Sequence, residues 1–410
     1  MVAPELPIET VTQIIKELGS DEYALAKISR LSRTFRALTL PFLFHHLCIS
    51  NGDVYRRAYR LLVLESPHIG QYVKHVALDS RGLQTTAYST DGICWLGADK
   101  FLAFLNALPA LEALRCDMDF YTGALASVLP NSSITTLHLS DISRESSVDF
   151  VNLLMQVLKA GSQTIRSLTL QSIFVNEGIV CDRASRMSLA IPGVLWALED
   201  LTLIQCANLP FFSDNIQMPN VKSLELIDTE WTFRDCMPDS LNTLVTDNLL
   251  YVREFQRHRD TAFVAENVIF LHSLQASPWL DMDMVGMNML PRMCVPAGVK
   301  SLEIVLLATQ GERLHVDFSK HFERGLQDEI ISLHRHGSLE KFLITVESFP
   351  GVRKAHLEVF FFKLKSLGVL DVQGGSLPRS CSRPGRYVYP PDSTYYGTGA
   401  PNKWTWNPGF

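Results

Sequence analysis

The stretch IRSLTL, residues 165–170, and its later counterpart LEDLTL, residues 198–203, decide the fold. Each begins with an aliphatic residue and continues with two polar or small residues, a second aliphatic, one further residue and a third aliphatic. Residues two apart in an extended chain point to the same side, so Leu168 and Leu170 predict a strand with one buried face. The pattern recurs along most of the chain, in copies that begin at Val73, Leu111, Ile134, Ile165, Leu198, Val221, Leu241, Val299, Leu339 and Leu367.

Turn-forming residues precede many of these copies, for example Pro219-Asn220 and Gly337-Ser338. From Leu111 to Leu241 the copies step by 23, 31, 33, 23 and 20 residues, which leaves room for a short strand and a return helix or loop. Helical returns are visible at residues 101–105 and 149–158. The set resembles the divergent leucine-rich-repeat regions of F-box proteins. That resemblance implies an α/β fold, an irregular solenoid of parallel strands with helix or loop returns.

The residue between the last two aliphatics of each copy predicts a second face. In such a coil the aliphatics point inward and this residue faces the concave side, so these positions should line one surface. The series changes from basic or neutral residues in the early copies to acidic residues in the late ones. We predict that this surface binds a protein target of unknown identity; the alternative is an ordinary solvated strand face. The predicted target-binding residues are Arg115, His138, Thr169, Thr202, Glu225, Glu303 and Asp371.

Residues 6–47 predict a small unit of three helices. Ile8, Val11, Ile15 and Leu18 follow helical spacing, and Gly19 then stops the first helix. We expect Ser20 to cap the second helix and Pro41 to end the third. Three helices in about forty residues bury too little apolar surface to stand alone, so the unit should lean on a partner or on the rest of the chain.

The same run, LPIETVTQIIKELGSDEYALAKISRLSRTFRALTLPFLFHHL, resembles an F-box. It has the opening Leu-Pro, Glu9 shortly after it, an apolar pair followed by Leu18, and a closing Pro-Phe-Leu-Phe. Thr10 stands where the family usually has an aliphatic residue, and Phe35 where many members have Trp. The resemblance implies docking onto a Skp-family adaptor, which links such proteins to a cullin-based ubiquitin ligase. A helical cap on a larger domain is the alternative. The residues that the resemblance implies for adaptor binding are Leu6, Pro7, Ile15, Leu18, Ile28 and Leu43.

Composition narrows the classes of protein. With 410 residues, 47% of them hydrophobic, the chain can bury a large core, which excludes wholesale disorder. A net charge of -6 argues against a nucleic-acid partner, and the apolar runs fall short of the roughly 18 residues that a membrane span needs. Eight widely separated cysteines suit a reducing compartment, so we expect the protein in the cytoplasm, the nucleus or both.

Two segments depart from the repeat. Between Leu244 and Val299 the pattern lapses, and residues 282–293 hold five of the eleven methionines, which we interpret as core or an insertion. Residues 374–410 are rich in Gly and Pro with seven interspersed aromatics. We expect an irregular segment that caps the end of the repeats, with a partner-recognition arm as the alternative.

Reactive motifs are missing from the sequence. It has no phosphate-binding Gly-rich loop, no Gly-x-Ser-x-Gly elbow and no His-Glu-x-x-His. The close histidine pairs are His45-His46, which lies in the F-box-like region, and His334 with His336, which has no nearby Cys or carboxylate pair to complete a metal site. We therefore expect no catalytic residues, no cofactor and no metal, and a protein that is not an enzyme.

Together these observations predict three parts: an F-box-like helical domain at 1–50, a leucine-rich-repeat-like solenoid at 51–373 and an irregular segment at 374–410. Under the leading hypothesis the chain is the substrate-recognition subunit of a Skp–cullin–F-box ubiquitin ligase, a cytoplasmic or nuclear member of the ubiquitin-conjugation pathway. The alternative is a repeat scaffold for protein–protein interaction that is independent of ubiquitin.

Overall fold

The computed structural model describes residues 7–18, 21–49, 52–78, 98–117, 122–140, 148–173, 193–206, 209, 216–227, 229, 240–247, 264–273, 298–307, 326–346 and 354–374. Leu6, the methionine-rich stretch and residues 375–410 lie outside this set, so the predictions made for them stay predictions. The chain divides into two compact units, residues 1–220 with 235–237 and residues 221–234 with 238–410. This division does not bear on the predicted boundaries at residues 50 and 373.

Three helices open the first unit: α1 (Ile8–Glu17), α2 (Glu22–Ile28) and α3 (Arg33–Leu43). α3 packs against both α1 and α2, and Ile15, Leu25 and Thr39 are buried among them. The buried Thr39 hydroxyl is satisfied by the backbone carbonyls of Phe35 at 2.9 Å and Arg36 at 3.1 Å. The predicted number and order of helices in this segment agree with the structure.

Two details of the helix ends differ from the prediction. The cap of α2 is Asp21, whose carboxylate accepts a hydrogen bond from the Ala24 N–H at 2.9 Å, whereas Ser20 lies outside the described residues. Pro41 lies within α3 and does not end it. A proline in the last turn removes only one hydrogen bond, and the helix continues because the Phe44 N–H bonds to the Leu40 carbonyl at 3.0 Å.

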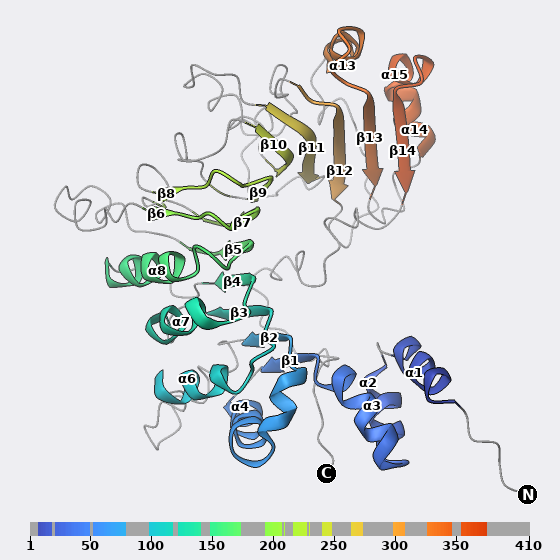
Figure 1. The fold of residues 1–410 in the computed structure, drawn as a ribbon. Helices are drawn as coiled ribbons and strands as arrows, with labels where there is room; N and C mark the ends of the chain where they lie inside the picture. The colour runs from blue at the N-terminus through green and yellow to red at the C-terminus, as the bar shows by residue number, and fades with distance from the viewer. Residues whose placement is uncertain are drawn as a thin grey trace, which may run out of the picture. The chain divides into compact units, whose positions relative to one another are not determined.

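Within the residues that the structure describes, the main array has twelve strands in chain order, six in each unit (Figure 1). Each neighbouring pair within a unit is parallel, and a separate parallel pair joins β6 (Gly193–Val194) to β8 (Ile216–Gln217). The strands of the first unit are β1 (His46–Ile49), β2 (His75–Leu78), β3 (Ala113–Asp117), β4 (Thr136–Ser140), β5 (Ser167–Gln171) and β7 (Asp200–Ile204). Those of the second are β9 (Ser223–Ile227), β10 (Ser240–Thr246), β11 (Val264–Ser273), β12 (Ser301–Leu307), β13 (Lys341–Val346) and β14 (Leu370–Gly374).

Helical segments connect many of these strands. In the first unit they are α4 (Gly52–Tyr59), the π-helix η1 (Arg60–Glu65), the 3-10 helices η2 (Pro67–Tyr72) and η4 (Leu129–Asn131), α6 (Ala98–Asn106), α7 (Thr122–Val128) and α8 (Val148–Ala160). In the second they are α13 (Leu326–Arg335), α14 (Lys354–Phe360) and α15 (Phe362–Ser366). Figure 1 shows α6, α7 and α8 along one side of β2 to β5. The predicted α/β class with parallel strands and helical returns is confirmed.

The repeat pattern places the core. All ten predicted copies coincide with strands, and apart from the partly exposed Leu370 the aliphatics at the second and third positions, such as Leu168, Leu170, Leu201 and Leu203, are buried. Removing one such side chain from water contributes roughly 1.5–3 kcal/mol. The first aliphatic is also buried in every copy except the last, where Leu367 is 45% exposed.

Among the described strands of the main array, β1 and β11 were not predicted, nor was the separate pair β6 and β8. β1 comes from residues 46–49, inside the segment assigned to the helical domain, and β11 lies where the pattern was thought to lapse. Both fit the template if aromatic residues and Ala are admitted: Phe44-x-x-Leu47-x-Ile49 and Ala265-x-x-Val268-x-Phe270. The parallel array therefore begins only two residues after α3 ends.

Candidate interaction surface

One backbone geometry recurs just before the strands and sets their register. The Lys74 carbonyl accepts hydrogen bonds from the N–H groups of Glu112 at 2.8 Å and Ala113 at 3.0 Å. The carbonyl of Glu112 in turn accepts from Thr135 and Thr136. The same double acceptance occurs at the carbonyls of His45, Thr135, Arg166, Lys222 and Lys300. The series starts at His45, so the first repeat includes the residues that directly follow α3.

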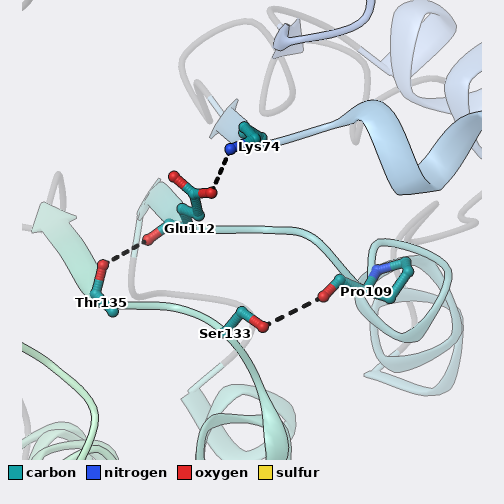
Figure 2. A network of polar contacts seen from close by, with 5 residues as sticks. All are labelled: Lys74, Pro109, Glu112, Ser133 and Thr135. Carbon is teal, nitrogen blue, oxygen red and sulfur yellow. Dashed lines mark hydrogen bonds and ion pairs between the residues drawn. The ribbon is translucent and has the colours of Figure 1, made fainter. Parts of the chain in front are cut away.

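Side chains reinforce this edge of the sheet (Figure 2). The Lys74 ammonium pairs with Oε1 of Glu112 at 2.5 Å, and the Thr135 hydroxyl lies 3.5 Å from the Glu112 carbonyl. The Ser133 hydroxyl donates to the Pro109 carbonyl at 3.3 Å. Lys300 and Glu266 form the equivalent pair in the second unit at 2.8 Å. Such solvent-exposed ion pairs contribute little to stability.

The predicted target-binding positions are aligned by register within each unit. Arg115 is paired with His138, His138 with Thr169, and Thr169 with Thr202. A second such series lies in the second unit. In strand order it consists of Glu225, Val245, Ile269, Glu303, Leu343 and Asp371, each paired with the next. The strand register therefore brings the residues of each series onto one face of their sheet.

Burial separates these positions into two groups. Arg115, His138 and Asp371 are partly exposed, whereas Thr169 and Thr202 are buried and only 3% of Glu225 and 8% of Glu303 is exposed. A partner could reach the partly exposed residues directly. It could reach the buried ones only after the residues that cover them had moved. Whether any of the seven binds a target stays a prediction.

The buried carboxylate of Glu303 has a specific partner. The Thr345 hydroxyl of β13 donates to Oε1 of Glu303 at 2.6 Å. Burial raises the pKa of Glu303, while the Thr345 hydrogen bond and the charge of Lys341 act in the opposite direction. This arrangement is typical of a satisfied polar group inside a packed layer.

A cluster of three histidines occupies the start of the array. The ring centroids of His46 and His75 are 4.4 Å apart, and the His45 ring lies 4.5 Å from the first and 4.9 Å from the second. Burial, and then the neighbouring histidine charges, lower the pKa of His46. The pKa of His75 is also lowered, chiefly by burial and by His45, although Glu112 opposes the shift. The pair His45-His46 is visible in the sequence, whereas His75 joins it only through the register of β1 against β2 and was not predicted.

The residues implied for adaptor binding are not equally accessible. Pro7 is exposed, Leu18, Ile28 and Leu43 are half-buried, and Ile15 is 1% exposed within the three-helix unit. Other apolar side chains of the unit, which were not among the residues implied for adaptor binding, lie open to solvent. These are Ile8 at 51%, Ile14 at 44%, Tyr23 at 71% and Leu31 at 70% exposure.

No protein-family model matches this chain, and no curated protein matches it. Within the described ranges, no group of three or more His, Cys, Asp or Glu side chains could hold a metal ion. None of the helices described is both long and apolar enough to cross a bilayer.

Proposed function

We propose that the chain is a substrate-recognition subunit of a Skp–cullin–F-box ubiquitin ligase. In this proposal α1 to α3 dock onto a Skp-family adaptor, and the strand array, as a leucine-rich-repeat-like region, holds a protein target. The chain itself performs no bond chemistry. Its contribution is to raise the concentration of the target near the ubiquitin carrier, as in any tethered pair of binding sites. Such a role places the protein in the cytoplasm, the nucleus or both.

The observation that carries the proposal is the set of exposed apolar side chains on the three-helix unit. Ile8, Ile14 and Leu31 are between 44% and 70% exposed, although the same short unit buries Ile15 and Leu25 completely or nearly so. An apolar surface on a small unit is typical of a protein-binding site. Ile15 would then act by stabilising the unit, because a partner cannot touch a side chain that is buried within it.

The connection to the array fits the same role. α3 packs against η2, and only Phe44 and His45 separate it from β1. A short, packed connection holds the docking unit in a fixed position with respect to the first strands. This same contact also favours the alternative, in which α1 to α3 are a helical cap on an interaction scaffold that never binds an adaptor.

Point variants distinguish the two functions. A truncation that starts at residue 51 would remove β1 from the sheet and would damage the fold in both cases. We therefore choose Ile14→Glu and Leu31→Glu, with Leu64→Glu as the matched control, because Leu64 on η1 is 67% exposed and lies outside the three helices. Each protein is mixed with a purified eukaryotic Skp adaptor, and binding is measured by calorimetry and co-elution.

The proposal expects micromolar or tighter binding by the wild type and by Leu64→Glu. Each of the other two variants should weaken binding by at least about tenfold, or 1.4 kcal/mol, because a charge replaces an apolar contact in the interface. Thermal unfolding should stay unchanged in all three. Lack of binding by a folded wild-type protein, or equal binding by all variants, would favour the scaffold.

A further inference from the structure

We propose that the first four strands of the array, β1 to β4, bind an anionic protein segment through Arg115, His138, His46 and His75. The four residues are called the histidine–arginine face below. The segment would carry carboxylate or phosphate groups on its side chains. The inference rests on the proposed function in one respect, that the segment belongs to a target recruited by the chain. Binding of the segment itself does not require the adaptor.

Strand register brings the four side chains to the same side of the sheet. Alternate residues of a strand share a face, so His46 lies on the face of Cys48, and His75 on that of Ala77. The pairings Cys48–Ala77, Ala77–Arg115 and Arg115–His138 then connect all four strands in one row. His46 and His75 are paired in the preceding row. Neighbouring strands lie about 4.8 Å apart, so a short extended segment could reach both rows.

Access to this face is better than to the rest of the series. His46 and Cys48 are exposed, and His75, Ala77, Arg115 and His138 are partly exposed. From β5 onward the equivalent residues Thr169 and Thr202 are buried. Cys48 on β1 and Ala77 on β2 precede Arg115 in its row, and both have small side chains. The Arg115 side chain therefore has no bulky neighbour on the side of β2.

The charge on this face calls for an anion. Among the described residues the Arg115 guanidinium has no ion pair or hydrogen bond, although it is partly buried. Glu112, just before β3, is paired with Lys74, and Asp117 ends β3 two positions after Arg115. A partly buried, unpaired cation costs solvation energy that a bound carboxylate or phosphate would recover, since a guanidinium binds either group with two hydrogen bonds.

His138 is held in place for such a contact. Its Nε2 lies 3.1 Å from Oε1 of Gln171 on β5, the next strand along the row. This hydrogen bond orients the ring beside Arg115. Protein is favoured over nucleic acid as the source of the anion because the chain carries a net charge of -6 and Arg115 is the only permanent charge of the face.

Proton binding should be coupled to binding of the anion. The charged and titratable groups around His46 and His75 are His45, Lys74, Glu112 and, across the face, Arg115 with His138. Burial, followed by repulsion from His75 and His45, lowers the pKa of His46, and burial followed by repulsion from His45 lowers the pKa of His75, so both rings favour the neutral form. An anion stabilises the imidazolium form, and affinity should therefore rise as the pH falls.

The test uses the full chain and four labelled probes: the peptides (Gly-Glu)5, (Gly-phosphoSer)5 and (Gly-Ser)5, and a single-stranded oligonucleotide of similar charge. Binding is measured by fluorescence anisotropy at low salt. We expect one or both anionic peptides to bind and (Gly-Ser)5 not to bind. Preference between the first two identifies carboxylate or phosphate as the source of the anion.

Arg115→Gln should weaken peptide binding by at least about tenfold, because it removes the bidentate contact. Arg166→Gln is the matched control, since Arg166 is an exposed arginine of the same unit that lies before β5, and it should change binding by less than about twofold. For the wild type, lowering the pH from about 7.5 to 6 should tighten binding by about threefold or more, and the double variant His46→Gln/His75→Gln should lose this response.

Four results would overturn the inference: equal binding of (Gly-Ser)5, equal effects of the two arginine variants, preference for the oligonucleotide, or no peptide binding at all. Failure of the adaptor experiment would leave these outcomes untouched, because no adaptor is present. Failure here with intact adaptor binding would remove this face as the target site and leave the docking proposal in place.

Discussion

The Thr345 hydroxyl of β13 donates a 2.6 Å hydrogen bond to the Glu303 carboxylate of β12, and both side chains are at most 8% exposed. Glu303 was predicted to lie on an open binding surface, so its burial changes what it can do. The buried charge is tolerated because one oxygen has a donor, and a buried carboxylate without that donor would be costly.

Removing the donor should therefore destabilise the second unit. Thr345→Val keeps the shape of the side chain but leaves Oε1 of Glu303 unpaired, and we expect a loss of about 1–3 kcal/mol in the free energy of unfolding. Glu303→Gln keeps an oxygen that can accept the bond and removes the buried charge, so it should be neutral or stabilising at pH 7.5. Denaturant unfolding of the two variants and the wild type measures both effects.

The pH dependence of Glu303→Gln has a definite sign. Because the folded-state pKa of Glu303 is raised, the native protein holds the proton more tightly than the unfolded chain does. Ionisation thus costs stability at pH values above the folded pKa, and this cost disappears below the unfolded value of roughly 4.3. Any advantage of Glu303→Gln should shrink as the pH is lowered toward 4. An advantage that does not vary with pH would contradict this explanation.

Glycine at position 70 is required by a close approach. A β-carbon on Gly70 would lie 1.9 Å from the Ala107 carbonyl oxygen just after α6, and backbone cannot easily give way. We expect Gly70→Ala to cost about 1–3 kcal/mol or more, the range for overpacked cores. Gly123→Ala is the matched control, because a β-carbon there, in α7, meets nothing within 4 Å. The control should stabilise the protein by about 0.5–1 kcal/mol, since alanine favours helix. Thermal melts compare the pair.

Much of the strand array could be predicted from sequence. Ten strands follow from the aliphatic pattern because all of them but β14 bury two side chains on one face, as Leu168 and Leu170 do. β1 and β11 were not predicted because Phe44, Ala265 and Phe270 occupy positions where the template admitted only aliphatic residues. The buried Cys206 was also missed, because it lies three residues after Leu203, at a position that the template did not include.

The candidate site was less predictable, for physical reasons. Strand alternation tells which side chains share a face but not what covers that face, so the burial of Thr202 and Glu225 could not be foreseen. Likewise, His46 and His75 are 29 positions apart in the chain, and only the register of β1 against β2 brings them together. Residues from different strands that form one site need a register, which a single sequence does not contain.

Cysteine reactivity should follow burial. The Cys206 thiol donates weak hydrogen bonds to the Ile204 carbonyl at 3.3 Å and the Leu170 carbonyl at 3.4 Å, and burial raises its pKa to about 12. Because the thiolate is the reactive form, Cys206 should resist alkylation at pH 8, as should the buried Cys116. Cys48 on β1 is exposed and should react within minutes. Iodoacetamide labelling followed by peptide mass spectrometry measures all three, and fast labelling of Cys206 in the folded protein would contradict its buried position.

The histidine cluster should make the first repeat sensitive to acid. The pKa values of His46 and His75 are lowered, so the native state binds their protons less readily than the unfolded chain does. Stability is therefore unaffected at pH values well above the unfolded pKa of about 6.5 and falls as the pH drops through that value. The melting temperature should decline between about pH 7.5 and 5.5, and His46→Gln/His75→Gln should flatten this decline, because two neutral side chains replace two that must charge.

His334→Gln/His336→Gln on α13 and the turn after it is the matched control, which removes two histidines of the second unit and should leave the decline in place. Parallel declines in the wild type and in the His46/His75 variant would show that other groups cause the acid response.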